Sequence, residues 1–252
     1  MTNNITPSLQ AIYGVDPNSK DFEFAYKNGI TTVAVTPGSG NVVCGWVFAA
    51  KTYGNNIFKM NIKNPVALKV ALGGNPKRTY GERNQCPSTR MSIPNIIKNL
   101  LKDTEEYLHK KEQNENYDYD EKLEAVIPVI KKEIPLKIHC TQFDMMTAIE
   151  IANEFDVEFA LDHAWGASEY IDEIVESGCA INFGPLGSLK NQGESSLVDI
   201  ESVIELDDQG VLTSIITDAP ILSIDSLIHH AGEAIRKGGE IKNVLKMITI
   251  NP

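Results

Sequence analysis

Four side chains that can bind a metal ion or move a proton stand at or near the ends of short apolar runs. Lys69 lies within "ALKVAL", His139 ends "LKIH", His163 ends "FALDH" and Asp218 ends "SIITD". Two imidazoles and a carboxylate suit Zn²⁺ or a similar divalent ion, with one position left open for water. A bound metal lowers the pKa of that water, and Asp218 can then take its proton.

Helical patterns separate these apolar runs. "PLKIHC" is followed by "FDMMTAIEIANEF", and "VEFALDHA" by "SEYIDEIVESG", in which Ser168 is a candidate N-cap. Strand–helix repetition of this kind predicts βαβ units and a parallel sheet. We predict parallel strands at "TTVAV", "ALKVAL", "LKIH", "EFALD", "AINFG" and "TSIIT". Because the strand ends of a (β/α)8 barrel face one mouth, His139, His163 and Asp218 should meet there.

Each of these residues also has a structural interpretation. A histidine at a strand end is commonly a hydrogen-bonded structural residue, Lys69 can form an ion pair, and Asp218 before Ala219-Pro220 can form a turn. The occurrence of all four at comparable strand ends favours a shared site. Alternation along the strand directs Asp162 to the face opposite His163, toward the outer layer.

Composition restricts the partners. The chain has 252 residues, a formal net charge of -11 and a sequence pI near 4.9, which argue against a nucleic-acid or anionic-membrane surface. The N-terminus shows no signal-peptide pattern, and no apolar run is long enough to span a membrane. The four cysteines form no CxxC pair, so neither a disulfide framework nor a cysteine zinc site is indicated. We expect a cytoplasmic protein.

The three other histidines, His109, His229 and His230, are expected to lie outside the metal site. The charge-rich segment 102–126 predicts a solvated helix and loop, with His109 on its surface. His229 and His230 are adjacent in a helical pattern and therefore do not share a face.

In order along the chain, six stretches resemble the amidohydrolase superfamily, in the branch of imidazolonepropionase-like and prolidase-like metal-dependent hydrolases. They are "AIYGVDPNSKDFEFAYKNGITTVAVTPGSGNVVCG", "ALKVALGGNPKRTYGERNQCPSTRMS", "LKIHC", "FALDHA", "GVLTSIITDAP" and "VLKMITINP". The resemblance implies an α/β fold, a (β/α)8 TIM-barrel-like domain over residues 1–252, and hydrolysis of a C–N bond by a metal-bound water.

The resemblance also implies roles for the strand-end residues. His139 and His163 correspond to the histidines after the fifth and sixth strands, and both are expected metal ligands. Asp218 corresponds to the aspartate that serves as ligand and general base, so His163 and Asp218 are the expected catalytic residues. Lys69 falls near the position where some members use a carboxylated lysine to bridge two metals.

The sequence departs from the family pattern in ways that predict an incomplete barrel. No His-x-His pair of a first strand is present, since the first histidine is His109. Thr141 and Gln142 replace groups expected to help bind substrate, and the family's further β-structured domain does not follow residue 252. We therefore expect weak Zn²⁺ binding by this chain alone.

Three functional hypotheses follow. The first is a metal-dependent amidohydrolase acting on a small molecule such as a cyclic amide or a dipeptide. The others are a truncated or non-catalytic barrel, and one part of a split enzyme whose missing strand comes from a partner chain. Loss of a first strand would leave the edges of "TTVAVTP" and "LTSIITD" unpaired. We expect segment 4–14 to cover that gap, or the protein to form a homo-oligomer along it.

Overall fold

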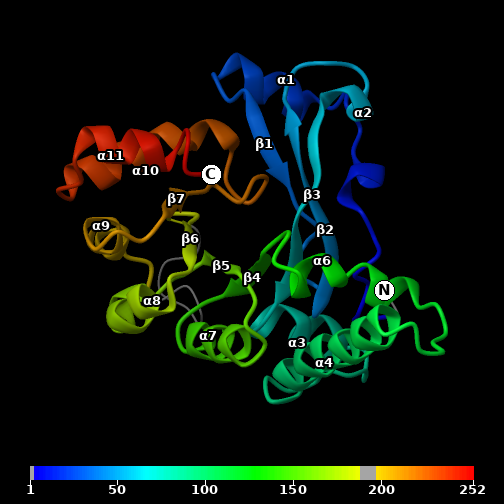
Figure 1. The fold of residues 1–252 in the computed structure, drawn as a ribbon. Helices are drawn as coiled ribbons and strands as arrows, with labels where there is room; N and C mark the ends of the chain where they lie inside the picture. The colour runs from blue at the N-terminus through cyan, green and yellow to red at the C-terminus, as the bar shows by residue number, and fades with distance from the viewer. Residues whose placement is uncertain (1–2, 188–196) are drawn as a thin grey trace. The chain divides into compact units, whose positions relative to one another are not determined.

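A computed structural model describes residues 3–187 and 197–252 of the chain (Figure 1). The chain divides into two compact units: unit 1 comprises residues 1–138 and 151–158, and unit 2 comprises residues 139–150 and 159–252. Strand β4 (Leu136–Cys140) begins in unit 1 and ends in unit 2, and helix α7 (Asp144–Glu154) begins in unit 2 and ends in unit 1.

Unit 1 is built on three antiparallel strands: β1 (Thr32–Val35), β2 (Val43–Lys51) and β3 (Asn61–Ala71). The predicted strands "TTVAV" and "ALKVAL" exist, but both run antiparallel to β2, a strand that was not predicted. The physical reason is the length of the connections. Segments 36–42 and 52–60 are shorter than the dozen or so residues that a parallel crossover needs, so each strand turns back on its predecessor.

Helices complete unit 1. The longest is α4 (Ser92–Glu112), whose buried residues Ile93, Ile97, Leu100 and Leu101 recur at helical spacing. Its charged half is solvated and His109 is exposed, as the charge pattern predicts. The others are η1 (Ala11–Gly14), α1 (Lys20–Lys27), α2 (Ile57–Met60), α3 (Gly74–Gly81), α5 (Glu121–Glu124) and α6 (Ile127–Ile130). Within residues 3–187 and 197–252, no helix has both the length and the apolar character needed to cross a bilayer.

The segment before α1 lies along an edge of β2. Ile5 and Gln10 form parallel bridges with Val43 and Trp46, and the Trp46 amide donates to the Leu9 carbonyl at 2.7 Å. β1 pairs with the later part of the same strand, from Phe48 onward. Segment 4–14 therefore covers an edge of β2, and not the edges of "TTVAVTP" and "LTSIITD" that it was predicted to cover.

Unit 2 contains the parallel strands. β5 (Phe159–His163), β6 (Ala180–Phe183) and β7 (Thr213–Ile215) pair in parallel, and β4 precedes β5 in the sheet order. These strands match the predictions "LKIH", "EFALD", "AINFG" and "TSIIT", and the sheet they form is curled (Figure 1). The α/β class is confirmed. The eight-stranded count and the single domain over residues 1–252 stay predictions.

The helices of unit 2 follow the strands. They are η2 (Ala167–Glu169), α8 (Ile171–Ser177), α9 (Glu201–Asp208), η4 (Ile224–Ser226), α10 (Leu227–Arg236) and α11 (Ile241–Met247). The predicted cap Ser168 is wrong for α8, which begins after Tyr170, because Ser168 lies in η2 and its hydroxyl donates to Asp199 at 2.9 Å. His229 is exposed and His230 is buried on α10, so they occupy different faces as predicted.

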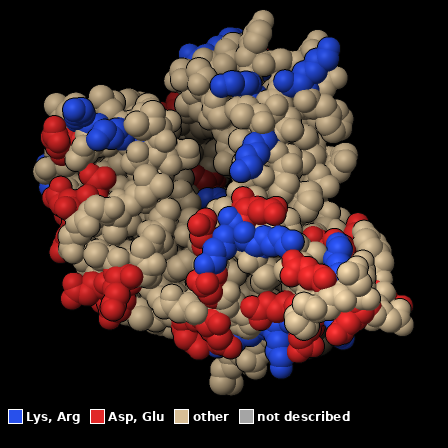
Figure 2. Space-filling model, viewed as in Figure 1, with Lys and Arg blue, Asp and Glu red and all other residues tan. Residues whose placement is uncertain are grey.

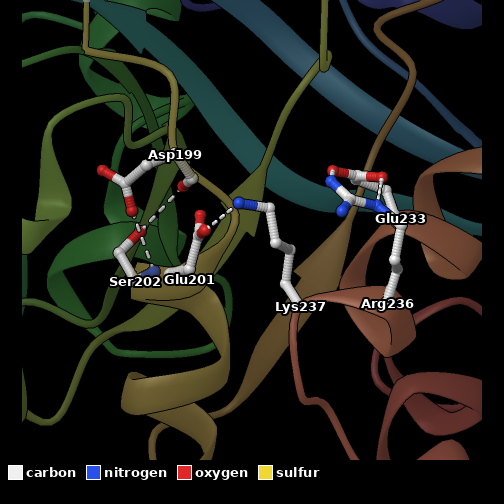
Figure 3. Close-up of polar contacts among 6 residues, drawn as sticks. All are labelled: Asp199, Glu201, Ser202, Glu233, Arg236 and Lys237. Atoms are coloured by element: carbon white, nitrogen blue, oxygen red, sulfur yellow. Dashed lines mark hydrogen bonds and ion pairs between the residues drawn. The ribbon is translucent and has the colours of Figure 1, made fainter.

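Polar contacts hold α9 in place (Figure 3). A carboxylate oxygen of Asp199 accepts from the Ser202 amide at 2.9 Å, which satisfies one of the amides that a helix start leaves unpaired. Glu201 pairs with Lys237, which directly follows α10. The hydrogen bond from Lys237 holds the pKa of the Glu201 carboxyl below its usual value.

Candidate active site

His139 and His163 lie together in unit 2. His139 is near the end of β4 and His163 ends β5. Their ring centroids are 4.4 Å apart with an edge-to-face angle of 72°, and their exposed fractions are 7% and 6%. The sequence predicted this meeting from strand-end position alone. Two buried imidazoles at one place can serve as paired ligands or as a proton-transfer pair.

The orientation of His163 is fixed by a backbone oxygen. Its Nδ1 lies 2.8 Å from the carbonyl oxygen of Gly184, which directly follows β6. A carbonyl only accepts, so in the neutral ring the proton sits on Nδ1 and the lone pair on Nε2. This is the arrangement by which proteins fix the tautomer of a metal-ligating or basic histidine.

The backbone at these strand ends adopts a left-handed conformation. The φ angles of Gln142, His163, Ala164 and Asp218 are +50°, +73°, +48° and +50°. Each such non-glycine residue costs on the order of 1 kcal/mol or more. They follow or end β4, β5 and β7, the strands that carry the predicted site residues. Because Asn84, Asn114, Lys132 and Asp156 also have positive φ elsewhere, this backbone strain is compatible with a functional site but does not locate one.

The sequence did not identify the groups that hold this region. The Gln142 amide donates to the Trp165 carbonyl at 2.7 Å, linking the segments that follow β4 and β5. The Trp165 ring centroid lies 5.3 Å from that of His163 and packs beside it. The signals available were the tryptophan two residues after His163 and the Gly184-Pro185 pair after "AINF". Neither signal indicates that the Gly184 carbonyl oxygen contacts the His163 imidazole.

Asp162 belongs to the other face of β5. It is buried, it stands in register with Asn182 of β6, and it accepts from the Asn182 side-chain amide at 3.0 Å. Because successive strand residues point to opposite faces, this pair lies away from the His163 imidazole. The Asp162 carboxylate therefore hydrogen-bonds within the sheet, on the face opposite His163, as predicted from the sequence.

Asp218 follows β7 and is half-buried. Its carbonyl oxygen accepts from the Ile221 amide at 2.8 Å, so the residue makes the turn that its place before Ala219-Pro220 predicts. Its roles as ligand and general base stay predictions.

Lys69 lies in unit 1. It is buried in β3, in register with Gly45 of β2. Burial raises the pKa of the neighbouring Cys44 thiol to about 12, while the positive charge of Lys69 acts in the opposite direction. A place for Lys69 in the active site stays a prediction.

The two histidines fit a divalent metal by donor type and by the fixed orientation of His163. Across the described ranges, however, no group of three or more His, Cys, Asp and Glu side chains is placed to hold a metal ion. The region therefore supplies two suitable ligands, and the third ligand predicted from the sequence, Asp218, is not part of such a group.

Polar side chains at the ends of parallel strands define the class: an α/β protein whose chemistry sits at the strand ends. No protein-family model matches the chain. The crystal structure of an amidohydrolase from Thermotoga maritima MSB8 is 32% identical with a TM-score of 0.94, covering the whole of this chain and 67% of that one. The amidohydrolase tasK of Hapsidospora irregularis is 21% identical over 283 residues, covering the whole of this chain. The chain spans 28% of the length of that relative. It belongs to the amidohydrolase superfamily.

Proposed function

We propose that the chain contributes to hydrolysis of a C–N bond in a small molecule, such as an amide, a cyclic amide or a dipeptide, with a divalent metal held by His139 and His163. The supporting observation is the buried pair of imidazoles, with the His163 Nδ1 directed at the Gly184 carbonyl. That contact leaves Nε2 as the ligand or basic atom. Zn²⁺ or another divalent metal suits this donor type.

The following residues have roles in the proposed hydrolysis. A divalent ion, when bound, supplies an acidified water and polarises the carbonyl of the scissile bond. Asp218 holds a proton on its carboxylate during the reaction and is a further ligand. Trp165 packs against His163 and keeps solvent from one side of the imidazole. Lys69 is proposed as a ligand in carboxylated form.

A second candidate is a barrel that keeps the fold with weak metal binding, or that receives further ligands from a partner chain. The observation that favours it is the lack of a three-ligand group in the described part of the chain. The two candidates differ in one property, the affinity of this chain alone for metal.

Cobalt(II) titration of the apoprotein tests the proposal, because Co²⁺ replaces Zn²⁺ in sites of this type and is visible in absorption. We expect a weak site whose affinity falls at least about tenfold in both His139→Ala and His163→Ala. His229→Ala, on the exposed face of α10, is the matched control and should leave the titration unchanged. Equal Co²⁺ affinity in the parent and both site variants would reject the histidine pair as ligands.

Activity requires a separate measurement with Zn²⁺ added and a panel of amides, cyclic amides and dipeptides. Metal-dependent turnover that both histidine variants abolish supports the enzyme. A histidine-dependent metal site without turnover of any amide supports the second candidate. In that case, a peptide carrying a His-x-His strand should raise both Zn²⁺ affinity and stability if a partner chain completes the site.

A further inference from the structure

The charge of the chain is unevenly distributed. Residues 24–81 contain seven Lys and Arg and no Asp or Glu, although the whole chain carries a formal charge of -11. The remaining residues therefore carry a formal charge of -18. This acid-free stretch forms the second half of α1 and all of β1, β2, α2, β3 and α3 in unit 1. In Figure 2 the part of unit 1 around α2 shows basic side chains, whereas the end that carries α4 shows many acidic side chains interleaved with basic ones.

Large aromatic side chains are exposed on the basic part. Tyr13, Tyr53 and Phe58 have exposed fractions of 73%, 75% and 61%. The Tyr13 and Phe58 ring centroids are 6.1 Å apart, which joins η1 to the turn between β2 and β3. Lys59 directly follows Phe58, and Lys63 is exposed at the start of β3. We call the surface formed by Tyr13, Tyr53, Phe58, Lys59 and Lys63 the basic tip.

The basic tip rests on a rigid base. Beneath it Ile12, Phe48, Ala50, Ile57 and Met60 form a buried apolar cluster. The core of this region is thus complete without the exposed rings. Exposed aromatic side chains gathered on one surface are typical of interaction surfaces, where tyrosine and phenylalanine are enriched.

A complementary surface lies on α4 and the segment after it. A hollow of about 300 Å³ there is lined by three carboxylates, Asp103, Glu106 and Asp118, together with Tyr117 and one cation, Lys110. The Tyr117 ring meets the Tyr107 ring edge-to-face with centroids 5.2 Å apart. We call this the acidic hollow. Its volume is at the low end of small-molecule sites, but it can receive one or two side chains.

We propose that the basic tip of one chain binds the acidic hollow of a second copy. The two surfaces lie at opposite ends of unit 1 (Figure 1), so they cannot meet within one chain. Contact between two basic tips would oppose lysine to lysine, whereas tip against hollow pairs Lys59 with carboxylates and with the face of Tyr117. A contact between two different surfaces is head-to-tail, and repeats into rings or open chains.

Sedimentation velocity across a concentration series tests the contact. The parent chain should associate reversibly, and raising the ionic strength should weaken the association because exposed charges are screened. Lys59→Glu and Asp118→Lys should each weaken it about tenfold or more. Lys242→Glu on exposed α11 changes the charge by the same amount as Lys59→Glu, outside both surfaces, and is its control. A parent that stays monomeric at low ionic strength, or an association that both variants leave unchanged, overturns the proposal.

Mixing the two variants gives the sharpest result. Lys59→Glu keeps an intact hollow and Asp118→Lys keeps an intact tip, so the mixture should regain the association that each variant lacks alone. Placing both substitutions in one chain should restore head-to-tail association by exchanging the charges. Failure of both restorations overturns the proposal, as does a tip that binds anionic lipid vesicles while the protein shows no self-association.

Discussion

One glycine in each unit lets another segment of backbone pack directly against it, and the two contacts serve different purposes. Gly45 in β2 has a φ of +126°, and a Cβ there would lie 2.3 Å from the Leu9 carbonyl oxygen. Gly184 after β6 has a φ of +135°, and a Cβ there would lie 2.1 Å from the Ile216 carbonyl oxygen. In unit 1 the glycine admits an outer segment onto a sheet edge. In unit 2 it admits a neighbouring strand end and presents its own carbonyl to His163.

The largest effect is expected for Gly184→Ala. The new methyl group meets backbone that cannot move without disturbing β7, and its φ is unfavourable for alanine. We expect a loss of about 3 kcal/mol or more in the free energy of unfolding, measured by urea denaturation. Gly187→Ala is the control, because Gly187 has a φ of +80° and nothing within 4 Å of an added Cβ. A Gly184→Ala loss no greater than that of the control would contradict the steric explanation.

Gly45→Ala should cost less, about 1–2 kcal/mol, because the segment carrying Leu9 can lift from β2. The variant should also be cut faster by protease within residues 3–13. Deletion of residues 1–13 provides a double-mutant cycle: once the segment is gone, Gly45→Ala should cost only its backbone strain. Additive losses would show that the segment and the glycine are independent.

Helix-start carboxylates extend the comparison. Asp199 accepts from the Ser202 amide and from the Ser168 hydroxyl, which belongs to a distant turn. Asp120 of unit 1 accepts from the amides of Lys122 and Leu123 at the start of the four-residue α5. Asp199→Ala should cost about 1–2 kcal/mol and Asp120→Ala about half as much in thermal or urea unfolding. Asparagine at either position keeps the acceptor and should recover most of the loss.

The smallest expected effects are those of pH, and they also differ between the units. Burial lowers the pKa of His230 below 6.5, and the neighbouring His229 lowers it further. A hydrogen bond with the Ile216 backbone acts in the opposite direction. As the pH falls, His230 therefore becomes protonated in the unfolded chain before it does in the folded one, and stability is lost below about pH 6.5. His230→Gln should flatten that part of the profile.

Glu124 in unit 1 titrates in a lower range. Hydrogen bonds from Lys111 and Tyr107 hold its pKa below 4.5. Its contribution is present above pH 4.5 and is lost as pH falls through the lower folded value. Glu124→Gln should therefore be less stable than the parent above about pH 4.5, and the difference between them should shrink as the pH falls below that value. Identical profiles for the His230 and Glu124 variants from neutral to acid pH would show that other groups control the acid response.

Strand positions and pairing direction could be predicted from the sequence only where strands alternate with helices. The runs at β4 to β7 alternate with helical stripes, so both strand position and parallel direction could be predicted, and with them the meeting of His139 and His163. Prediction failed for unit 1 because apolar runs do not specify their pairing direction, which here follows from the short connections 36–42 and 52–60. The Gly184 carbonyl was missed for another reason: its role depends on a φ of +135° and on a neighbour 21 residues away.

The pairing of residues 5–10 with β2 has a consequence during synthesis. An uncovered strand edge is a template for pairing with other chains, and β2 is apolar over most of its length. Residues 5–10 leave the ribosome before β2, so the strand meets its covering segment as soon as it emerges. The order of the chain thus protects this edge before β1 and β3 have both been placed, and before another nascent chain can occupy it.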